Sequence, residues 1–275
     1  MSDSTVNQEY FNMHKEIIAE VSRLTDEVEF NDLVLVDSEL QEQIRQLHPL
    51  SSVIDVPVNT EQYRMFINKI ADIVLSHQQQ LQETVTSILE SLKSDEQMVL
   101  LIEATKQFNH FYFEDFSKKH NLNAPILQFL SELAYRPYIK AFAKLVNPKI
   151  NLAQYNNNKC PVCGELVRII RSVDEGGREA CCVRCSTVWN AKRLQCPHCK
   201  NEDHEKLRYI TVGEDEDRKL YVCEVCKGYV KYINTQELLV QPDFFLVDLE
   251  TIYLDIVADQ QGYGIDVESG NNKVM

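Results

Sequence analysis

Nine cysteines lie between positions 160 and 226, and eight of them form four pairs with the spacing Cys-x-x-Cys. Two cysteines at this spacing can direct both sulfurs from one tight turn toward a single metal ion, and backbone N–H groups can hydrogen-bond to those sulfurs. The pairs are Cys160/Cys163, Cys182/Cys185, Cys196/Cys199 and Cys223/Cys226. The residue types and their spacing therefore predict metal binding, with each pair forming one metal-binding knuckle.

The separations along the chain predict how the knuckles combine. Eighteen residues separate the first pair from the second and twenty-three separate the third from the fourth, and either gap fits a β-hairpin. Two knuckles bridged by a hairpin form a tetrahedral four-sulfur site of the zinc-ribbon or rubredoxin kind. The same order occurs twice, which indicates a tandem duplication. We expect one site on Cys160, Cys163, Cys182 and Cys185 and a second on Cys196, Cys199, Cys223 and Cys226.

The metal in such sites is expected to be structural. A small ribbon has little core of its own, and bound zinc supplies roughly 10–16 kcal/mol of apparent folding free energy in zinc-finger modules. Four thiolates accept zinc or iron equally well by geometry, so the residues leave the identity of the metal open. The alternatives are reduced structural thiols or a thioredoxin-like redox pair, and neither explains four evenly placed knuckles.

The ninth cysteine, Cys181, stands directly before Cys182 and falls outside the regular spacing. One interpretation is a small buried hydrophobic residue, or a bystander on the ribbon surface. The other is a redox-active or sulfur-accepting thiol beside a metal site. His198 lies inside the third knuckle, where we expect a loop residue and not a fifth ligand.

Short strands must position the knuckles. The apolar period changes from helical to alternating after an Asn-rich linker over 147–160. The strands are expected over 165–170, 178–181 and 187–193 in a first module, and over 206–212, 218–222 and 228–233 in a second. Residues 248–264 then predict one helix, which Asp248 can cap and Gly262 can end.

The first 150 residues contain no cysteine and place apolar residues at helical spacing. One stripe runs from Met98 to Phe116 and ends in an aromatic-rich segment over 108–116. These rings either fill a helical core or form a surface for a partner. Pro137 is expected to kink or break the last helix of this half.

The sequence thus predicts an α+β chain in which a helical domain precedes two tandem zinc-ribbon or rubredoxin-like modules and a C-terminal helix. The expected ranges are 1–150 for the all-helical domain, 151–195 for the first module, 196–236 for the second, and 237–275 for the C-terminal helix and tail.

Composition and charge narrow the function classes. Hydrophobic residues make up 44% and charged residues 25% of the chain, which is ordinary for a globular protein. The formal net charge of −14 disfavours a nucleic-acid groove. No apolar run approaches the ~20 residues that a membrane span needs, and the first residues do not resemble a signal peptide. We therefore expect a cytoplasmic protein without membrane insertion, in a compartment that keeps thiols reduced.

From residue 160 onward the chain resembles the formate dehydrogenase accessory protein (FdhE) family. The resemblance rests on "CPVCG", "CVRCSTVWNAKRLQCPHC", "CEVCKGYVKYI" and "DLETIYLDIVADQQGYG", which span residues 160 to 264. The second of these is the most specific, because Trp189 and Arg193 stand in a fixed order between two Cys-x-x-Cys pairs. The helical half fits in character, with "ELAYRPYIKAF" as its best segment, and Cys181 is not part of the pattern.

The resemblance implies two rubredoxin-like modules, with iron as the first expectation for the metal and zinc as the second. It also implies a protein that is not an enzyme. Such a protein would bind the catalytic subunit of a molybdenum-dependent formate dehydrogenase and would be required for the activity of that enzyme.

Two other function classes stay open. A nucleic-acid-binding zinc ribbon would need a basic stripe with interleaved aromatic residues, and the ribbons offer few adjacent basic residues, Lys192 and Arg193 among them. A thiol oxidoreductase or sulfurtransferase would use Cys181. The sequence shows no Ser/His/Asp or Cys/His arrangement and no phosphate-binding glycine loop to support such an enzyme.

Overall fold

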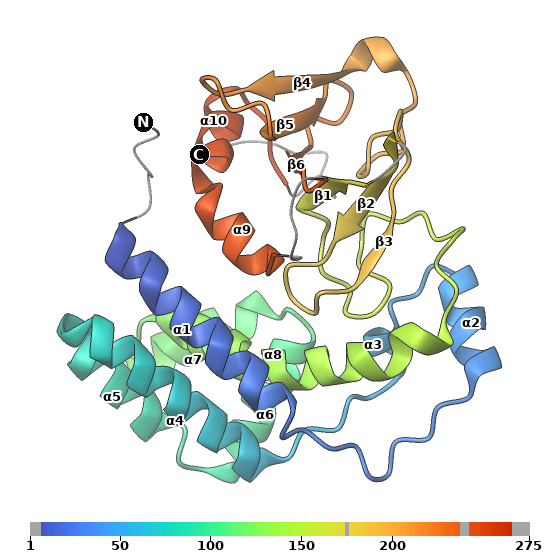
Figure 1. Ribbon diagram of the computed structural model, residues 1–275. Coiled ribbons are helices and arrows are strands. Elements are labelled where there is room, and N and C mark those ends of the chain that lie inside the picture. Colours follow the sequence, from blue (N-terminus) through green and yellow to red (C-terminus); the bar gives the residue numbers. More distant parts are fainter. Residues whose placement is uncertain (1–6, 174–175, 237–241, 266–275) are drawn as a thin grey trace. The chain divides into compact units, whose positions relative to one another are not determined.

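The computed structural model describes residues 7–173, 176–236 and 242–265 (Figure 1). It combines α-helices with a β-sheet, which confirms the α+β class. The described residues divide into two compact units. We call Asn7–Val34 with Ile54–Leu145 the helical unit, and we call Leu35–Val53 with the described residues from Val146 onward the sheet unit.

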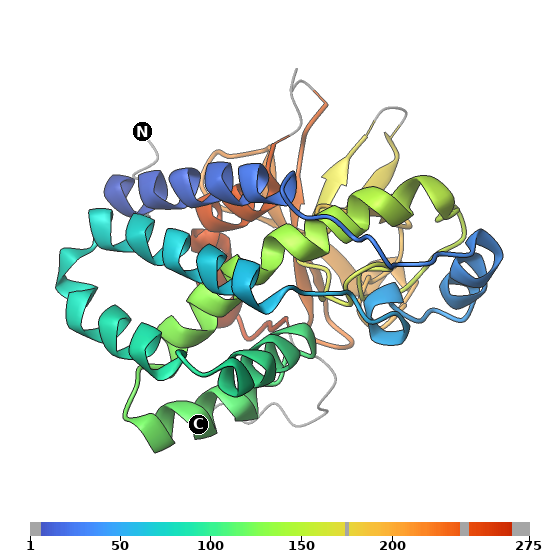
Figure 2. The ribbon, with the colours of Figure 1, turned by 90° about the horizontal axis from the view of Figure 1, so that it is seen from below.

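The helical unit confirms the helical N-terminal half. It is built from α1 (Gln8–Thr25), α4 (Thr60–His77), η1 (Gln79–Leu81), α5 (Gln82–Ser91), α6 (Asp95–Lys106), α7 (His110–His120) and α8 (Ala124–Val146). The side chains of Asn7, Asn59 and Asn109 accept hydrogen bonds from first-turn N–H groups and so begin three of these helices. Helices α1 and α4 lie side by side (Figure 2) and bury Ile17 and Ile70. In the described ranges, no helix has the length and apolar character that crossing a bilayer requires.

The aromatic-rich segment divides between core and surface. The apolar stripe from Met98 to Phe116 belongs to two helices, α6 and α7, which are joined through Phe108 at a φ of 54°. Phe113 and Phe116 are buried, whereas the side chain of Phe111 is 84% exposed. The core interpretation therefore holds for part of the segment only.

Pro137 does not break the last helix of this unit. Helix α8 continues through it from Ala124 to Val146. Ala134, Tyr138 and Ile139 are buried on both sides of the proline. Burial of apolar surface at about 25 cal/mol per Å² offsets the ~3 kcal/mol that a proline costs inside a helix. The predicted break is therefore wrong, and the alternative of a kink stays a prediction.

In the sheet unit, both modules share one sheet. The strands are β1 (Ile169–Ser172), β2 (Arg178–Cys181), β3 (Val188–Asn190), β4 (Leu207–Thr211), β5 (Arg218–Cys223) and β6 (Tyr229–Ile233), in the order β3-β2-β1-β6-β5-β4. Pairing is antiparallel within each module, as two hairpin modules predict. Strands β1 and β6 pair in parallel, with Ile169 opposite Lys231, and this pairing joins the modules. We call it the seam.

Helices α9 (Phe244–Glu250) and α10 (Ile252–Gln260) cover one face of this sheet (Figure 1). Phe244 and Val247 pack with buried residues of the first module, and Leu254 and Ala258 pack with buried residues of the second. The sequence predicts a single helix from Asp248, but two helices form here.

Asp248 is therefore not the capping residue. Asp243 caps α9 by accepting a hydrogen bond from the N–H of Phe245, and Thr251 separates α9 from α10. The predicted end of the helix is confirmed, because Gly262 follows α10 with a φ of 78°.

The compact units differ from the expected residue ranges. The sequence places Leu35–Val53 in the first domain, but its helices α2 (Asp37–Arg45) and α3 (Leu50–Val53) belong to the sheet unit. The Gln41 amide exchanges two hydrogen bonds with the backbone of Asn151, at 2.7 and 3.1 Å. Such long-range contacts are not encoded in local spacing. Residues 174–175 of the first hairpin turn and residues 237–241 and 266–275 of the C-terminal range lie outside the described residues.

Candidate metal centres

The eight paired cysteines gather into the two groups that the spacing predicts. Site 1 holds Cys160, Cys163, Cys182 and Cys185, and site 2 holds Cys196, Cys199, Cys223 and Cys226. In each site all four sulfurs lie within 4.8 Å of one another. Sulfurs of opposite knuckles lie 3.4 and 3.5 Å apart in site 1, and 3.7 Å apart in both pairs of site 2.

Four sulfurs at these separations fit a tetrahedral ion. Metal–sulfur bonds of ~2.3 Å place the corners of a tetrahedron ~3.8 Å apart. The sulfurs of site 2 match that spacing closely, and the sulfurs of site 1 are slightly closer together. An all-sulfur donor set is one that zinc and iron both accept. Each site could therefore hold zinc or iron, and ligation by each of the eight cysteines stays a prediction.

All four knuckles share one backbone geometry. The residue after the second cysteine has a positive φ each time, with 77° at Gly164, 65° at Ser186, 63° at Lys200 and 56° at Lys227. The N–H of the first cysteine donates to the carbonyl five residues later, over 2.8 to 3.0 Å. This turn aims both sulfurs to one side of the backbone. Its fourfold recurrence agrees with the duplication that the sequence indicates.

The electrostatics of site 1 favour a cation. Burial raises the pKa of the Cys160 and Cys163 thiols well above its ordinary value, because a dry pocket disfavours the thiolate. Burial also acts on Cys185, but hydrogen bonds from Cys160, Cys163, Cys182 and Thr187 hold its pKa well below the ordinary value. Four thiolates so close together need a positive charge beside them, and a bound metal ion supplies it.

Site 2 has similar thiol chemistry but is more exposed to solvent. A hydrogen bond from Cys196 lowers the pKa of Cys226 to about 5, against the opposing effect of burial. The N–H of Gly228 also lies 3.3 Å from the Cys226 sulfur. Cys199 is exposed and Cys226 is half-buried, whereas all four cysteines of site 1 are buried.

For Cys181 and His198, the structure agrees with the simpler interpretation of each, in which neither residue belongs to a metal site. Cys181 lies in neither site, and it is buried in an apolar cluster with Ile169 and Phe244. Burial raises the pKa of its thiol. The Nε2 of His198 lies 2.9 Å from the carbonyl oxygen of Tyr229 and must donate to it, because a carbonyl can only accept. His198 is thus held by the backbone of β6 and is not a member of either cysteine group.

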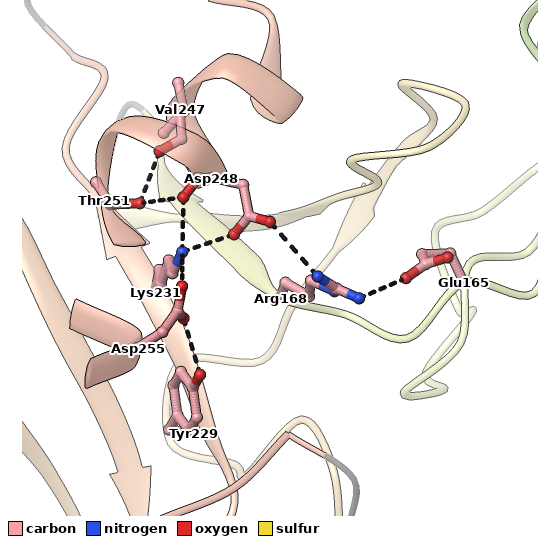
Figure 3. Close-up of polar contacts among 8 residues, drawn as sticks. All are labelled: Glu165, Arg168, Tyr229, Lys231, Val247, Asp248, Thr251 and Asp255. Atoms are coloured by element: carbon pink, nitrogen blue, oxygen red, sulfur yellow. Dashed lines mark hydrogen bonds and ion pairs between the residues drawn. The ribbon is translucent and has the colours of Figure 1, made fainter. Parts of the chain in front are cut away.

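A cluster of charged residues at the seam was not predicted as a unit (Figure 3). The Nζ of Lys231, in β6, lies 2.7 Å from Oδ1 of Asp248 and 2.6 Å from Oδ2 of Asp255. The hydroxyl of Tyr229 donates to Asp255 over 2.8 Å. Arg168, just before β1, lies 3.6 Å from Oδ2 of Asp248. The cluster therefore connects both modules to α9 and α10.

The sequence contains a signal for this cluster. In "GYVKYI" the alternation of a strand places Lys231 on the same face as Tyr229 and Ile233. A lysine in line with apolar residues on a covered face needs an acidic partner. In the single helix that the sequence predicts over 248–264, Asp248 and Asp255 are seven positions apart, about two turns, so both can face one strand.

No protein-family model matches the chain. Two curated proteins are similar to part of it. An FdhE homolog of Rhizobium meliloti (strain 1021) is 29% identical over 113 residues, which are 38% of this chain and 35% of that protein. An FdhE homolog of Pasteurella multocida (strain Pm70) is 29% identical over 107 residues, which are 38% of this chain and 34% of that protein. The matched part of the chain spans about a third of the length of these relatives.

The fold has a likeness among solved structures. The crystal structure of the FdhE protein from Pseudomonas aeruginosa superposes on this chain with a TM-score of 0.57. The superposition covers 92% of this chain and 87% of the Pseudomonas aeruginosa chain. The sequences are 18% identical, so this likeness concerns the fold alone. The chain is thus similar to FdhE homologs over part of its sequence, and its fold is similar to that of an FdhE protein.

Proposed function

We propose that this chain is an accessory protein of a formate dehydrogenase. In the finer form of the proposal, it binds the catalytic subunit of a molybdenum-dependent enzyme in the cytoplasm and assists its maturation without catalysing a reaction itself. The observation that carries the proposal is the pair of four-cysteine sites built into one sheet, in a chain that is similar to FdhE proteins. The metal sites would keep that sheet rigid, so that it presents a fixed surface to a folded partner.

The burial of Cys181 supports a role without catalysis by this thiol. A thiol that accepts sulfur or exchanges disulfides needs access to solvent and a lowered pKa. Cys181 has neither, because it is fully buried and burial raises its pKa. The sulfur-transfer alternative therefore loses the residue on which it depended.

The pairing of basic residues supports a protein partner over a nucleic acid. Binding to a nucleic acid requires Lys and Arg side chains that are free to neutralise its phosphates and so release the counterions held there. In the ribbons, Lys192 lies 3.2 Å from Glu202, and Arg208 lies 2.8 Å from Glu224. Lys227 also pairs with Glu224. A surface of mixed and mutually paired charges suits a protein better than DNA or RNA.

Complementation with two adjacent cysteine variants tests the proposal. A strain that lacks this protein should make the formate dehydrogenase polypeptide but show little of its activity. The wild-type chain and Cys181→Ala should restore activity, because Cys181 is outside both sites. Cys182→Ala should not restore it. Full formate dehydrogenase activity in the deletion strain would contradict the accessory role.

A pull-down tests the finer claim about the partner. The purified chain, treated with nuclease, should retain the catalytic subunit of formate dehydrogenase from a cell extract, and the retained subunit should be identified by mass spectrometry. Metal analysis of that subunit tests whether the enzyme depends on molybdenum. Recovery of nucleic acid alone before nuclease treatment would instead favour the zinc-ribbon alternative.

A further inference from the structure

We infer that the two metal centres have different roles: site 1 is closed, and site 2 is an exchangeable centre at which an external thiol can replace Cys199 as a ligand. The inference concerns the ability of this chain to give up and take up a metal ion. It does not depend on which enzyme the chain assists, so it can fail while the proposed function stands, and the reverse.

Matched positions of the repeated knuckles differ in exposure. Cys163 and Cys199 each close the first knuckle of a module, and Cys163 is buried while Cys199 is exposed. Arg184 and Val225 each precede the second cysteine of the second knuckle in their modules. Arg184 is buried, whereas 59% of Val225 is exposed. The same local motif therefore encloses its sulfurs in site 1 and presents one of them to solvent in site 2.

Site 1 is enclosed by elements from outside its own module. The N–H groups of Leu50 and Ser51, at the start of α3, donate to the carbonyls of Pro161 and Val162 over 2.9 Å. These bonds hold α3 across the tip of the first knuckle, and they also satisfy two N–H groups that a helix start leaves unpaired. An incoming ligand would have to displace α3 to reach the first knuckle of site 1 from this side.

A second layer of contacts supports the other knuckle of site 1. The Thr187 hydroxyl lies 3.2 Å from the Cys185 sulfur, and the Asn147 amide lies 3.3 Å from that hydroxyl. In the second module the position equivalent to Thr187 is Gly228, which has no side chain to offer. Contacts of this outer kind typically change metal affinity 10- to 100-fold, so site 1 should hold its ion more firmly.

The exchange step at site 2 is a ligand substitution without electron transfer. The sulfur of an incoming thiol approaches from solvent on the side of Cys199 and bonds to the ion. The bond between the ion and Cys199 breaks, and the Cys199 thiolate takes up the proton that the thiol releases. The oxidation state of the metal does not change, and the step reverses when the thiol leaves. Cys196, Cys223 and Cys226 hold the ion throughout.

Zinc release from the full-length chain tests the inference. The protein is loaded with two zinc ions and mixed with the chromophoric chelator 4-(2-pyridylazo)resorcinol, with and without reduced glutathione. We expect release in two phases of one equivalent each, with rates that differ by about 10-fold or more. Glutathione should accelerate the fast phase in proportion to its concentration and should leave the slow phase unchanged. A single phase of two equivalents, or a fast phase that ignores glutathione, would overturn the inference.

Alkylation of the zinc-loaded wild-type protein assigns the phases to sites. Brief treatment with iodoacetamide, followed by peptide mass mapping, should label Cys199 first and leave the cysteines of site 1 unlabelled. Cys181 serves as an internal control, because it is buried in an apolar cluster and is not in either site. Labelling of Cys181 would report unfolding, and such time points are excluded. Labelling of Cys163 as fast as Cys199 would overturn the assignment.

A matched pair of variants gives an independent reading. Cys199→Ser should keep one ion, which leaves in the slow phase. Cys163→Ser should keep one ion, which leaves in the fast phase. If Cys163→Ser fails to fold, the alkylation map of the wild-type chain still decides the assignment. The reverse pattern in the two variants would show that site 1 is the exchangeable centre.

Discussion

The side-chain nitrogen of Lys231 lies 2.7 Å from Oδ1 of Asp248, at the seam where β1 and β6 join the two modules. Lys231 is fully buried. Its ammonium group also reaches the backbone carbonyl of Asp248 over 2.8 Å and a carboxylate oxygen of Asp255 over 2.6 Å (Figure 3). Each of its three N–H groups thus has an acceptor, so the buried charge is compensated. The cluster holds α9 and α10 to the seam.

Replacing Lys231 with methionine should strongly destabilise the sheet unit. Methionine matches the length of the lysine stem, but it leaves the two carboxylates of Asp248 and Asp255 without their shared cation. Breaking a buried pair in this way costs about 3 kcal/mol or more. Urea unfolding of the zinc-loaded chain measures this cost. Lys192→Met removes an exposed pair with Glu202 in the same unit, and it should change the free energy of unfolding by less than ~0.5 kcal/mol. Equal stability of the two variants would contradict the prediction.

The helical unit should lose stability in mild acid because of His14. This side chain is buried in α1 between the rings of Tyr10 and Phe129. Burial, and secondarily the charge of Arg136, lowers its pKa from 6.5 to about 4. The folded state therefore binds fewer protons than the unfolded state between these values. Stability should be complete above pH 6.5 and should decline by on the order of 2 kcal/mol as the pH falls toward 4.

Denaturant titrations at pH 7.5 and 4.5, followed by the helical circular-dichroism signal, measure the contribution of His14. His14→Phe keeps an aromatic ring in place and should flatten the decline between these pH values. His110→Gln changes an exposed histidine of the same unit and should leave the decline intact. A decline of the same size in the His14→Phe protein would assign the acid sensitivity to other groups.

Each knuckle has a residue with a positive φ directly after its second cysteine. Two substitutions with opposite expected effects on stability test the cost of that conformation. Gly164→Ala should lower the stability of the zinc-loaded sheet unit by about 1 kcal/mol, because alanine disfavours the φ of 77° found there. Steric contact is not the cause, since the nearest atoms to an added Cβ belong to Pro49 at 3.5 Å. Ser186→Gly, at a φ of 65°, should raise stability by a similar amount. Thermal unfolding would decide, and equal signs for the two changes would contradict this explanation.

Substitutions at Cys181 should separate folding from metal binding. Both Cys181→Ala and Cys181→Ser should keep two metal ions per chain. The serine variant should be less stable than the alanine variant by about 1 kcal/mol, because it places a hydroxyl in an apolar cluster. Cys182→Ser should lose about one ion. Metal analysis and unfolding of the three variants measure these effects, and loss of an ion on changing Cys181 would show that the ligands are paired differently.

The metal sites could be predicted closely from the sequence because their information is local. A Cys-x-x-Cys knuckle needs only a tight turn, and the number of residues between knuckles sets the length of the hairpin. The grouping of Cys160 with Cys185, and of Cys196 with Cys226, follows from that spacing and is found in the structure. The exclusion of Cys181 from both cysteine groups also followed from local order, because it stands one position outside the knuckle.

The features that join distant segments depend on how the chain packs in three dimensions. No local pattern pairs β1 with β6, because their parallel contact depends on how the two modules pack and not on the spacing inside either one. The same holds for Lys231, which finds its carboxylates in helices that follow the second module, and for α3, which closes site 1 from more than a hundred residues away. The knuckles are therefore alike in sequence and unlike in exposure. Burial is a property of everything that packs around a motif, whereas spacing is a property of the motif alone.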